Sequence, residues 1–468
     1  MKHAKYFLKK SLPFFIYFFI LGLMYFPCFH YDYAFGDDWY RLNTIFTDSL
    51  QWGQWETQSG RPLYGALLSL SNFGVSSYTD LKFFRFLYFL TIFVYCSSFY
   101  YYLSYYNFFS SSKLAQFLLP LIFSASPAYY LYGAWFICFP YGLGLIFSLF
   151  SYYLLKKSNG GIGLLITSYI LLSCSFAIYQ PAALMFVVYL FLDEIYVNGI
   201  KKSISVAIKP LAVLFFAMLT ALLMVKLLPY AFHLEVLERA KISWDITSNL
   251  LWFFGDAIPF SLKALTLLSL DKIEIYLFGF IITLFYWGIS QNPYKFILLV
   301  CLTLLSYSSQ LAVAEKWLSV RTSITLICLF LLVIFASILK LLSSSYLRAG
   351  VLVVLSFIFT FHTAYVFYHS FIEVSQKDYA EISEGTKKII EKRSEKCINL
   401  EPRTEEEKSI YYIYPGSYVL SDELGMRSSG IPWAWPGMLN QIRVERGGKP
   451  LKERDDCLRI QQTELLKR

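Results

Sequence analysis

Charged residues are scarce in this sequence. Asp, Glu, Lys and Arg make up 16% of its 468 residues, whereas soluble domains carry about 25%. The hydrophobic class reaches 57%, and Phe, Tyr and Trp together account for 20%. A soluble fold would have to expose this apolar surplus to water, which the hydrophobic effect opposes. The composition therefore excludes an ordinary soluble domain and predicts an integral membrane protein.

Motifs that hold metals or nucleotides are missing as well. The five histidines are scattered and no Cys-x-x-Cys pair occurs, so the common zinc-site spacings are absent. There is no glycine-rich phosphate loop of the kind that binds nucleotides. Most cysteines lie in or beside apolar runs. Only Cys397 and Cys457 lie in a polar segment, and whether they form a disulfide stays open.

Long apolar runs fill the first 371 residues. A membrane-spanning helix needs about 20 mainly apolar residues to cross about 30 Å of hydrocarbon. The runs predict an all-α polytopic membrane protein with about 11 transmembrane helices. They cover 12–29, 83–106, 114–133, 136–155, 162–179, 181–197, 207–229, 274–290, 294–313, 322–341 and 347–370. The apolar segment 62–76 is shorter and predicts an interfacial or re-entrant helix.

Basic residues predict the orientation of these spans. Four lysines precede the first run and no cleavage site follows it, so we expect a retained span with a cytoplasmic N-terminus. The loops expected on that same side contain Lys113, Lys156, Lys157, Lys201, Lys202, Lys209, Lys295, Lys340 and Arg348. An odd number of spans then places the C-terminus outside, in the periplasm of a bacterial cell. The short outer loop 314–321 departs from this pattern, because it carries Lys316 and Arg321.

The distribution of charge divides the chain into two parts. From 372 to 468, basic and acidic residues are dense and equal in number. This pattern predicts a small soluble periplasmic domain, α+β or α-rich, after a transmembrane domain of residues 1–371. The net charge of +9 therefore belongs to the membrane part, where basic residues set topology and meet anionic headgroups. We expect a multi-pass protein of the bacterial inner membrane with no nucleic-acid partner.

Polar residues concentrate in the first outer loop, residues 30–82. The centres of the spans are nearly free of charge, whereas transporters place ionisable groups at the midplane. Asp37 and Asp38 follow the first span closely, and Arg41 lies one helical turn further on. A carboxylate here could deprotonate a sugar hydroxyl, and Arg41 could hold a phosphate or orient a carboxylate. The alternative is an Asp N-cap with a surface ion pair.

The pattern Asp37-Asp38-x-x-Arg41, followed by Gly60-Arg61-Pro62, resembles the serotype-converting O-antigen glucosyltransferases of the Gtr type. More broadly, it is similar to the GT-C class of polytopic glycosyltransferases, which use lipid-phosphate sugars and carry an acidic motif in the first outer loop. Ser126-Pro127 with Trp135, and Tyr179-Gln180, extend the resemblance, which covers roughly residues 10–370. The C-terminal part matches nothing in these families.

The resemblance implies a membrane glucosyltransferase with a catalytic first periplasmic loop. Its donor would be undecaprenyl-phosphate glucose, supplied by a donor synthase and a donor flippase as functional partners. Its acceptor would be a lipid-linked O-antigen repeat unit on the periplasmic side. Transfer would invert the anomeric carbon, with Asp37 or Asp38 as general base and a slight preference for Asp38. A divalent metal is possible, and the soluble domain would either shape acceptor choice or give structural support.

The leaving phosphate needs positive charge near the outer membrane surface. Arg61, Lys226, Lys316 and Arg321 offer it, and Arg321 is preferred because a guanidinium pairs bidentately with phosphate. Snorkelling of Lys316 and Arg321 to the interface is the alternative. The expected substrate-binding residues are Arg41, Arg61, Trp135, Gln180, Glu315, Lys316 and Arg321.

Two other functions stay open. One is a different GT-C activity, with lipid A or a protein as the acceptor. The other is a non-enzymatic lipid-sugar transporter or flippase. The transporter hypothesis predicts that Asp37→Asn and Asp38→Asn are tolerated and that polar changes within the spans are not. The enzyme hypotheses predict the reverse.

Overall fold

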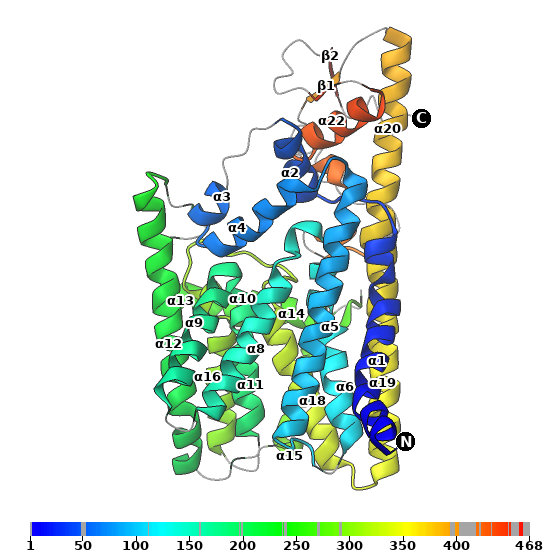
Figure 1. Ribbon diagram of the computed structural model, residues 1–468. Helices are drawn as coiled ribbons and strands as arrows, with labels where there is room; N and C mark the ends of the chain where they lie inside the picture. Colours follow the sequence, from blue (N-terminus) through cyan, green and yellow to red (C-terminus); the bar gives the residue numbers. More distant parts are fainter. Residues whose placement is uncertain are drawn as a thin grey trace.

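The computed structural model describes residues 2–47, 53–110, 112–158, 161–195, 197, 200–235, 237, 241–268, 272–289, 293–393, 398–401, 418–420, 423–431, 433–447, 449–450 and 458–461. Within these residues the chain is almost entirely helical, as the sequence predicts. Most helices lie side by side in one bundle, and short elements cover one end of it (Figure 1).

Six helical segments among the described residues are long and apolar enough to cross a membrane. They lie in α1 (Lys2–His30), η2 with α5 (Tyr78–Asp80, Leu81–Tyr105), η3 with α8 (Phe136–Cys138, Tyr141–Lys157), α12 (Ile200–Ala231), α18 (Ile324–Leu341) and α19 (Ser345–Phe367) with its continuation. The pair α6 (Lys113–Ser124) and α7 (Pro127–Ala134) makes a seventh if its 52° bend is counted as one span. Ser126 is extended before Pro127, and this conformation produces the bend.

The other expected spans are helical but shorter. They form α9 (Ile162–Ile178), α10 (Gln180–Ala183), α11 (Met185–Glu194), α15 (Ile273–Gly288) and α16 (Pro293–Ser306). The longest of these has 17 residues, which at 1.5 Å per residue rise about 26 Å, less than the thickness of about 30 Å. The expected number of eleven spans is therefore not confirmed. The expected break at Gln180-Pro181 is present, because Tyr179 is extended and Pro181 lies in the first turn of α10.

The short elements gather at the end of the bundle opposite the N-terminus, which we call the loop end (Figure 1). The first outer loop forms α2 (Asp37–Phe46), α3 (Gln54–Gln58), α4 (Pro62–Ser69) and η1 (Leu70–Phe73). The expected short helix within 62–76 is thus confirmed as α4 with η1. Between α12 and α18 the chain adds α13 (Ile246–Trp252), η5 (Phe253–Ala257), α14 (Ile258–Thr266) and α17 (Ser308–Leu311).

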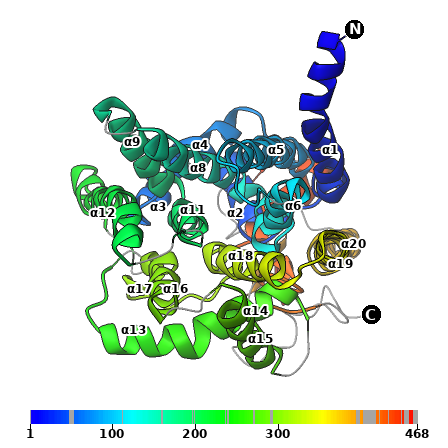
Figure 2. The ribbon, with the colours of Figure 1, turned by 90° about the horizontal axis from the view of Figure 1, so that it is seen from below.

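Burial separates central from peripheral helices. In the most apolar window of α18, 78% of the residues are buried, against 22% in α12. Seen along the bundle, α18 lies among neighbouring helices whereas α12 lies at the edge (Figure 2). The exposed side of α12 carries large apolar side chains such as Phe215 and Phe216. Such a face is stable against lipid and unfavourable in water, which supports a membrane-embedded protein.

The C-terminal part continues the bundle and then folds back. Helix α19 passes through η6 (Tyr368–Ile372) into α20 (Glu373–Arg393), so the expected domain boundary after residue 371 lies within a continuous helix. Strands β1 (Ile398–Glu401) and β2 (Leu458–Gln461) pair in parallel, and η7 (Ser428–Gly430) and α22 (Trp435–Glu445) lie at the loop end. Cys397 and Cys457 lie outside the described residues.

Contacts fix the returning segment, residues 418–447, to the bundle. Gly425 N donates to the Ser370 carbonyl at 2.7 Å, and Ser429 N donates to the Asp378 carboxylate at 2.8 Å. Arg427 pairs with Glu381 at 2.7 Å. The described tail residues therefore pack on the loop end, where they contribute to the site described next.

Candidate functional site

The site begins at the first turn of α2. Gly36 precedes this helix with φ +46°, a left-handed conformation that suits glycine. Asp37 and Asp38 then occupy the helix N-terminus, where the macrodipole favours negative charge. The two carboxylates point to different surroundings, because Asp38 is fully buried and Asp37 is half-exposed.

Asp38 is held by three donors. Its carboxylate accepts from Phe35 N at 3.2 Å, from Ile137 N at 3.2 Å and from Arg85 Nη2 at 3.3 Å. Burial raises the pKa of Asp38 to about 7, while Arg85 and the two backbone N–H groups act in the opposite direction. Asp38 thus ties α2 to α5 and to the turn after α7, and it has no exposed surface for a substrate hydroxyl.

Arg85, the charged partner of Asp38, was not among the residues expected from the sequence. It lies one turn into α5, is 1% exposed, and its guanidinium carbon lies 3.7 Å from the centre of the Tyr33 ring. Nη2 also donates to the Tyr33 carbonyl at 2.8 Å. A charged residue inside an apolar run is a recognised signal of a functional site, so Arg85 could have been chosen from the sequence.

Asp37 faces the returning C-terminal segment. Its Oδ1 accepts a hydrogen bond from Trp433 Nε1 at 2.8 Å. Asp37 is therefore the carboxylate of the pair that is partly exposed and bonded to the tail. The preference for Asp38 as the reactive group does not fit its complete burial.

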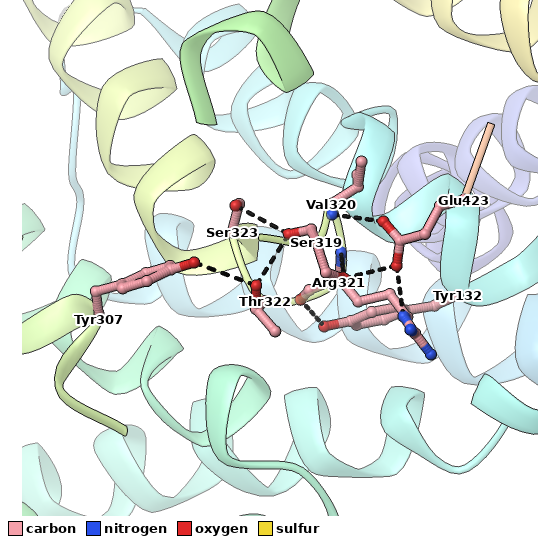
Figure 3. A network of polar contacts seen from close by, with 8 residues as sticks. All are labelled: Tyr132, Tyr307, Ser319, Val320, Arg321, Thr322, Ser323 and Glu423. Atoms are coloured by element: carbon pink, nitrogen blue, oxygen red, sulfur yellow. Dashed lines mark hydrogen bonds and ion pairs between the residues drawn. The ribbon is translucent and has the colours of Figure 1, made fainter. Parts of the chain in front are cut away.

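Arg321 lies in the connection before α18 and is held by the tail (Figure 3). Its Nε donates to Glu423 at 2.5 Å, and the same carboxylate accepts from Ser319 Oγ at 2.6 Å and from Val320 N at 2.5 Å. Glu423 is fully buried. The Arg321 carbonyl accepts from Tyr132 OH at 2.8 Å. Three donors thus converge on one carboxylate at the loop end.

Trp135 connects Arg321 to the acidic motif. The Arg321 guanidinium carbon lies 4.1 Å from the centre of the Trp135 ring, and that ring packs edge-on against Phe35 with centroids 5.1 Å apart. Phe35 immediately precedes Gly36 and the two aspartates. Trp135 Nε1 is buried and has no hydrogen-bond acceptor in the described part of the chain. A ligand oxygen that reached it would satisfy a donor whose isolation costs about 1–3 kcal/mol.

Arg61 and Gln180, two of the expected substrate-binding residues, bond to each other. Gly60 has φ +77° and Pro62 begins α4, so Gly60-Arg61-Pro62 is a turn into a helix. Arg61 Nε donates to Gln180 Oε1 at 3.2 Å, and Gln180 Nε2 donates to the Gly60 carbonyl at 3.1 Å. The guanidinium carbon of Arg61 also lies 4.9 Å from the centre of the Tyr179 ring.

Aromatic rings join this pair to Arg321. Tyr179 packs against Tyr132 with centroids 5.8 Å apart, and the Tyr132 hydroxyl binds the Arg321 backbone. A chain of contacts therefore runs from Gln180 and Arg61 through Tyr179 and Tyr132 to Arg321 and Trp135. Through Phe35 it reaches the turn that carries Asp37. We call Asp37, Trp135, Arg321, Arg61 and Gln180 the cluster.

Two expected site residues, Arg41 and Lys316, make other contacts. Arg41 is 6% exposed and donates to Asn72 Oδ1 at 2.7 Å and to the Leu68 carbonyl at 3.3 Å, so it ties α2 to η1. Burial lowers the pKa of Arg41, and Glu56 opposes that effect. Lys316 is exposed and bonds to Ser248 at the start of α13. Glu315, next to Lys316 in the connection before α18, is half-buried.

Glu423 and Trp433 were not chosen from the sequence. They lie 102 and 396 residues from their partners Arg321 and Asp37. No local pattern encodes contacts over such separations, and only the return of the tail onto the loop end creates them.

The described residues contain no group of three His, Cys, Asp or Glu side chains placed to hold a metal ion, so we assign no metal ligand. Comparison with protein-family models, with curated proteins and with solved structures finds no match to this chain. The fold and the site define a helical membrane protein with a polar, partly exposed cluster at one end of its bundle.

Proposed function

We propose that this protein is a membrane glycosyltransferase that moves glucose from undecaprenyl-phosphate glucose to a lipid-linked O-antigen repeat unit on the periplasmic face of the bacterial inner membrane. The observation that carries the proposal is the cluster itself. A half-exposed carboxylate and two guanidinium groups lie together at one end of an apolar bundle, close to where lipid headgroups would lie.

In this proposal Asp37 is the general base. It takes the proton of an acceptor hydroxyl while that oxygen attacks the anomeric carbon of the donor. The bond between the anomeric carbon and the phosphate oxygen breaks, and its electron pair leaves with the polyprenyl phosphate. Attack from the side opposite the leaving group inverts the anomeric centre. Asp38 and Arg85 position the turn that carries Asp37 rather than touching substrate.

Arg321 is the proposed ligand of the leaving phosphate. Glu423 accepts a hydrogen bond from Arg321 Nε. The two terminal amino groups of the Arg321 guanidinium lie on the side away from Glu423 (Figure 3). Charge grows on the phosphate oxygens as the glycosidic bond breaks, and a fixed guanidinium stabilises that change without reorganising. The unpartnered Trp135 Nε1 is a second donor next to it. Arg61, fixed by Gln180, adds positive charge to the same cluster.

The orientation and the soluble domain belong to the same proposal. The helix ends that carry the expected cytoplasmic lysines, such as Lys113 and Lys156, lie at the end of the bundle opposite the loop end (Figure 1). The positive-inside tendency then puts the loop end and the tail in the periplasm.

Transfer by the purified protein tests the function. The protein in detergent is given short-chain polyprenyl-phosphate glucose and a lipid-linked O-antigen repeat unit, and the product is followed by mass spectrometry. We expect one hexose to be added with inverted configuration. Arg321→Ala should lower kcat by about 10²–10³-fold. Lys388→Ala, at an exposed lysine of α20 that pairs with Glu384, is the matched control. Absence of transfer by the wild type with glucose and other hexose donors would contradict the proposal.

A further inference from the structure

The tail brings one exposed tryptophan to the proposed base. Trp433 donates its indole N–H to Asp37 at 2.8 Å, and the residue is 53% exposed. Trp39, Trp135 and Trp435 are buried, whereas Trp55 in α3 is 42% exposed. Trp433 therefore combines a polar contact at its edge with an aromatic surface that is accessible to a ligand.

The position of Trp433 is set by contacts on both sides of it. Before it, Ser428 Oγ accepts from Gly36 N at 2.9 Å. After it, Asn440 Nδ2 donates to Asn43 Oδ1 at 2.9 Å. Gly437 packs so closely on α2 that a Cβ atom there would overlap the Trp39 carbonyl. These contacts fix the position of the tail relative to α2, the helix that carries Asp37.

We propose that Trp433 is a positioning and specificity-determining residue, which orients Asp37 and offers the face on which the acceptor sugar stacks. This inference rests on the proposed function and names the part of the chain that selects its acceptor. The C–H groups of one face of a pyranose ring are apolar, and they pack well on the electron-rich face of an aromatic ring. The ligand class is therefore a pyranose with a free hydroxyl.

The hydrogen bond between Trp433 and Asp37 places a stacked sugar next to the proposed general base. Because the Asp37 carboxylate is bonded to the edge of the indole, a sugar lying on the indole face presents its hydroxyls toward that carboxylate. Tyr40, one turn after Asp37 in α2, is 48% exposed and adds a second aromatic side chain beside this position. The donor, by contrast, is assigned to Arg321 and Trp135 on the bundle. Acceptor and donor contacts thus come from different parts of the chain.

Two substitutions separate the two roles of Trp433. Trp433→Phe keeps an aromatic face and removes the N–H, so kcat should fall by about tenfold while the acceptor KM stays within about twofold of the wild type. Trp433→Leu also removes the aromatic face, so the acceptor KM should rise by about tenfold. The donor KM should be unchanged in both. Trp244→Leu, at a tryptophan that is 84% exposed and outside the cluster, is the matched control.

Several results would overturn the inference. An unchanged acceptor KM in Trp433→Leu, or an equal rise in the donor and acceptor KM values, excludes the stacking role. A wild-type kcat in Trp433→Phe excludes the positioning role. Melting temperatures of the detergent-solubilised variants identify any loss that comes from misfolding, and Trp433→Phe is the variant that best preserves packing.

A binding experiment separates this inference from the proposed function. Saturation-transfer NMR with the free O-antigen repeat oligosaccharide needs no turnover. We expect binding to the wild type and to Trp433→Phe, and at least about fivefold weaker binding to Trp433→Leu. If the wild type binds the glycan but transfers nothing, the function fails and the Trp433 site stands. Equal binding by all three proteins, or no binding by the wild type, overturns the Trp433 site.

Discussion

Arg85 Nη2 lies 3.3 Å from Asp38 Oδ2, and neither side chain is exposed. Taking two charges out of water is unfavourable unless each finds a partner, so each of these side chains is stable in its buried position only because the other is there. It joins the start of α5 to the first turn of α2 and thereby fixes the neighbouring Asp37. The most strongly buried charges at the loop end therefore have an architectural role.

Breaking this pair from one side should destabilise the protein. At pH 8, where the Asp38 carboxylate is ionised, we expect Asp38→Asn and Arg85→Met each to cost about 3–5 kcal/mol, because each leaves a buried polar group without its partner. The double variant should cost clearly less than the sum of the two. Denaturant unfolding in detergent measures all four proteins of the cycle. Strict additivity would show that the two side chains do not interact.

The stability contribution of Asp38 should depend on pH. Burial raises the pKa of Asp38 from its ordinary value of 3.8 to about 7, so between these values the folded chain binds a proton that the unfolded chain has released. Linkage then requires that this group favours the folded state most below about pH 4 and less as the pH rises to about 7. From pH 5 to 7 the melting temperature of the wild type should fall relative to that of Asp38→Asn. Above pH 7.5 the difference between the two melting temperatures should stay constant. A constant difference over the whole range would contradict the raised pKa.

Glu423 should hold the tail on the loop end. Its carboxylate accepts from Ser319, Val320 and Arg321, and Glu423→Ala leaves these buried donors without it. We expect a loss of about 3–5 kcal/mol and faster cleavage after residue 393 in limited proteolysis. Glu384→Ala removes a carboxylate that is 52% exposed and paired with Lys388, and it is the control. Equal cleavage rates in the two variants would show that Glu423 does not anchor the tail.

Gly437 tests the close packing of α22 on α2. A Cβ atom at this position would overlap the Trp39 carbonyl, so Gly437→Ala must displace one helix from the other. We expect a lower melting temperature and loss of most transfer activity, because the tail also carries Trp433. Gly350→Ala in α19 is the matched control, since a Cβ there meets no atom within 4 Å. Full activity in Gly437→Ala would show that the register of α22 is unimportant.

Local signals in the sequence predicted the helices well. Apolar runs located the long apolar helices, and Pro181 marked a break between two of the expected spans. The bend at Pro127 was not predicted, because it lies within the run 114–133, which was expected to be one span. The number of spans was not predictable to the same degree, because a run such as 162–179 ends as a 17-residue helix.

The site was predictable only in part, and for a physical reason. Trp135 and Gln180 were chosen only through the resemblance. Asp37 stood out among the polar residues of the first outer loop, and Arg321 stood out because it departs from the distribution of basic residues. Arg41 and Lys316 stood out for the same reasons, yet Arg41 donates a hydrogen bond to Asn72 and Lys316 donates one to Ser248. Glu423 and Trp433 reach the cluster only through long-range packing of the tail. The unequal burial of Asp37 and Asp38 likewise depends on Arg85 and the Ile137 backbone, which neighbouring residues do not reveal.

The most direct test compares Asp37→Asn with Asp38→Asn in the transfer of glucose from polyprenyl-phosphate glucose to a lipid-linked O-antigen acceptor. The account predicts that Asp37→Asn melts like the wild type and loses about 10²–10⁴-fold in kcat. Asp38→Asn should melt at a lower temperature and keep measurable transfer under conditions in which it is folded. Wild-type transfer by Asp37→Asn would contradict the central claim that Asp37 is the general base of a membrane glycosyltransferase.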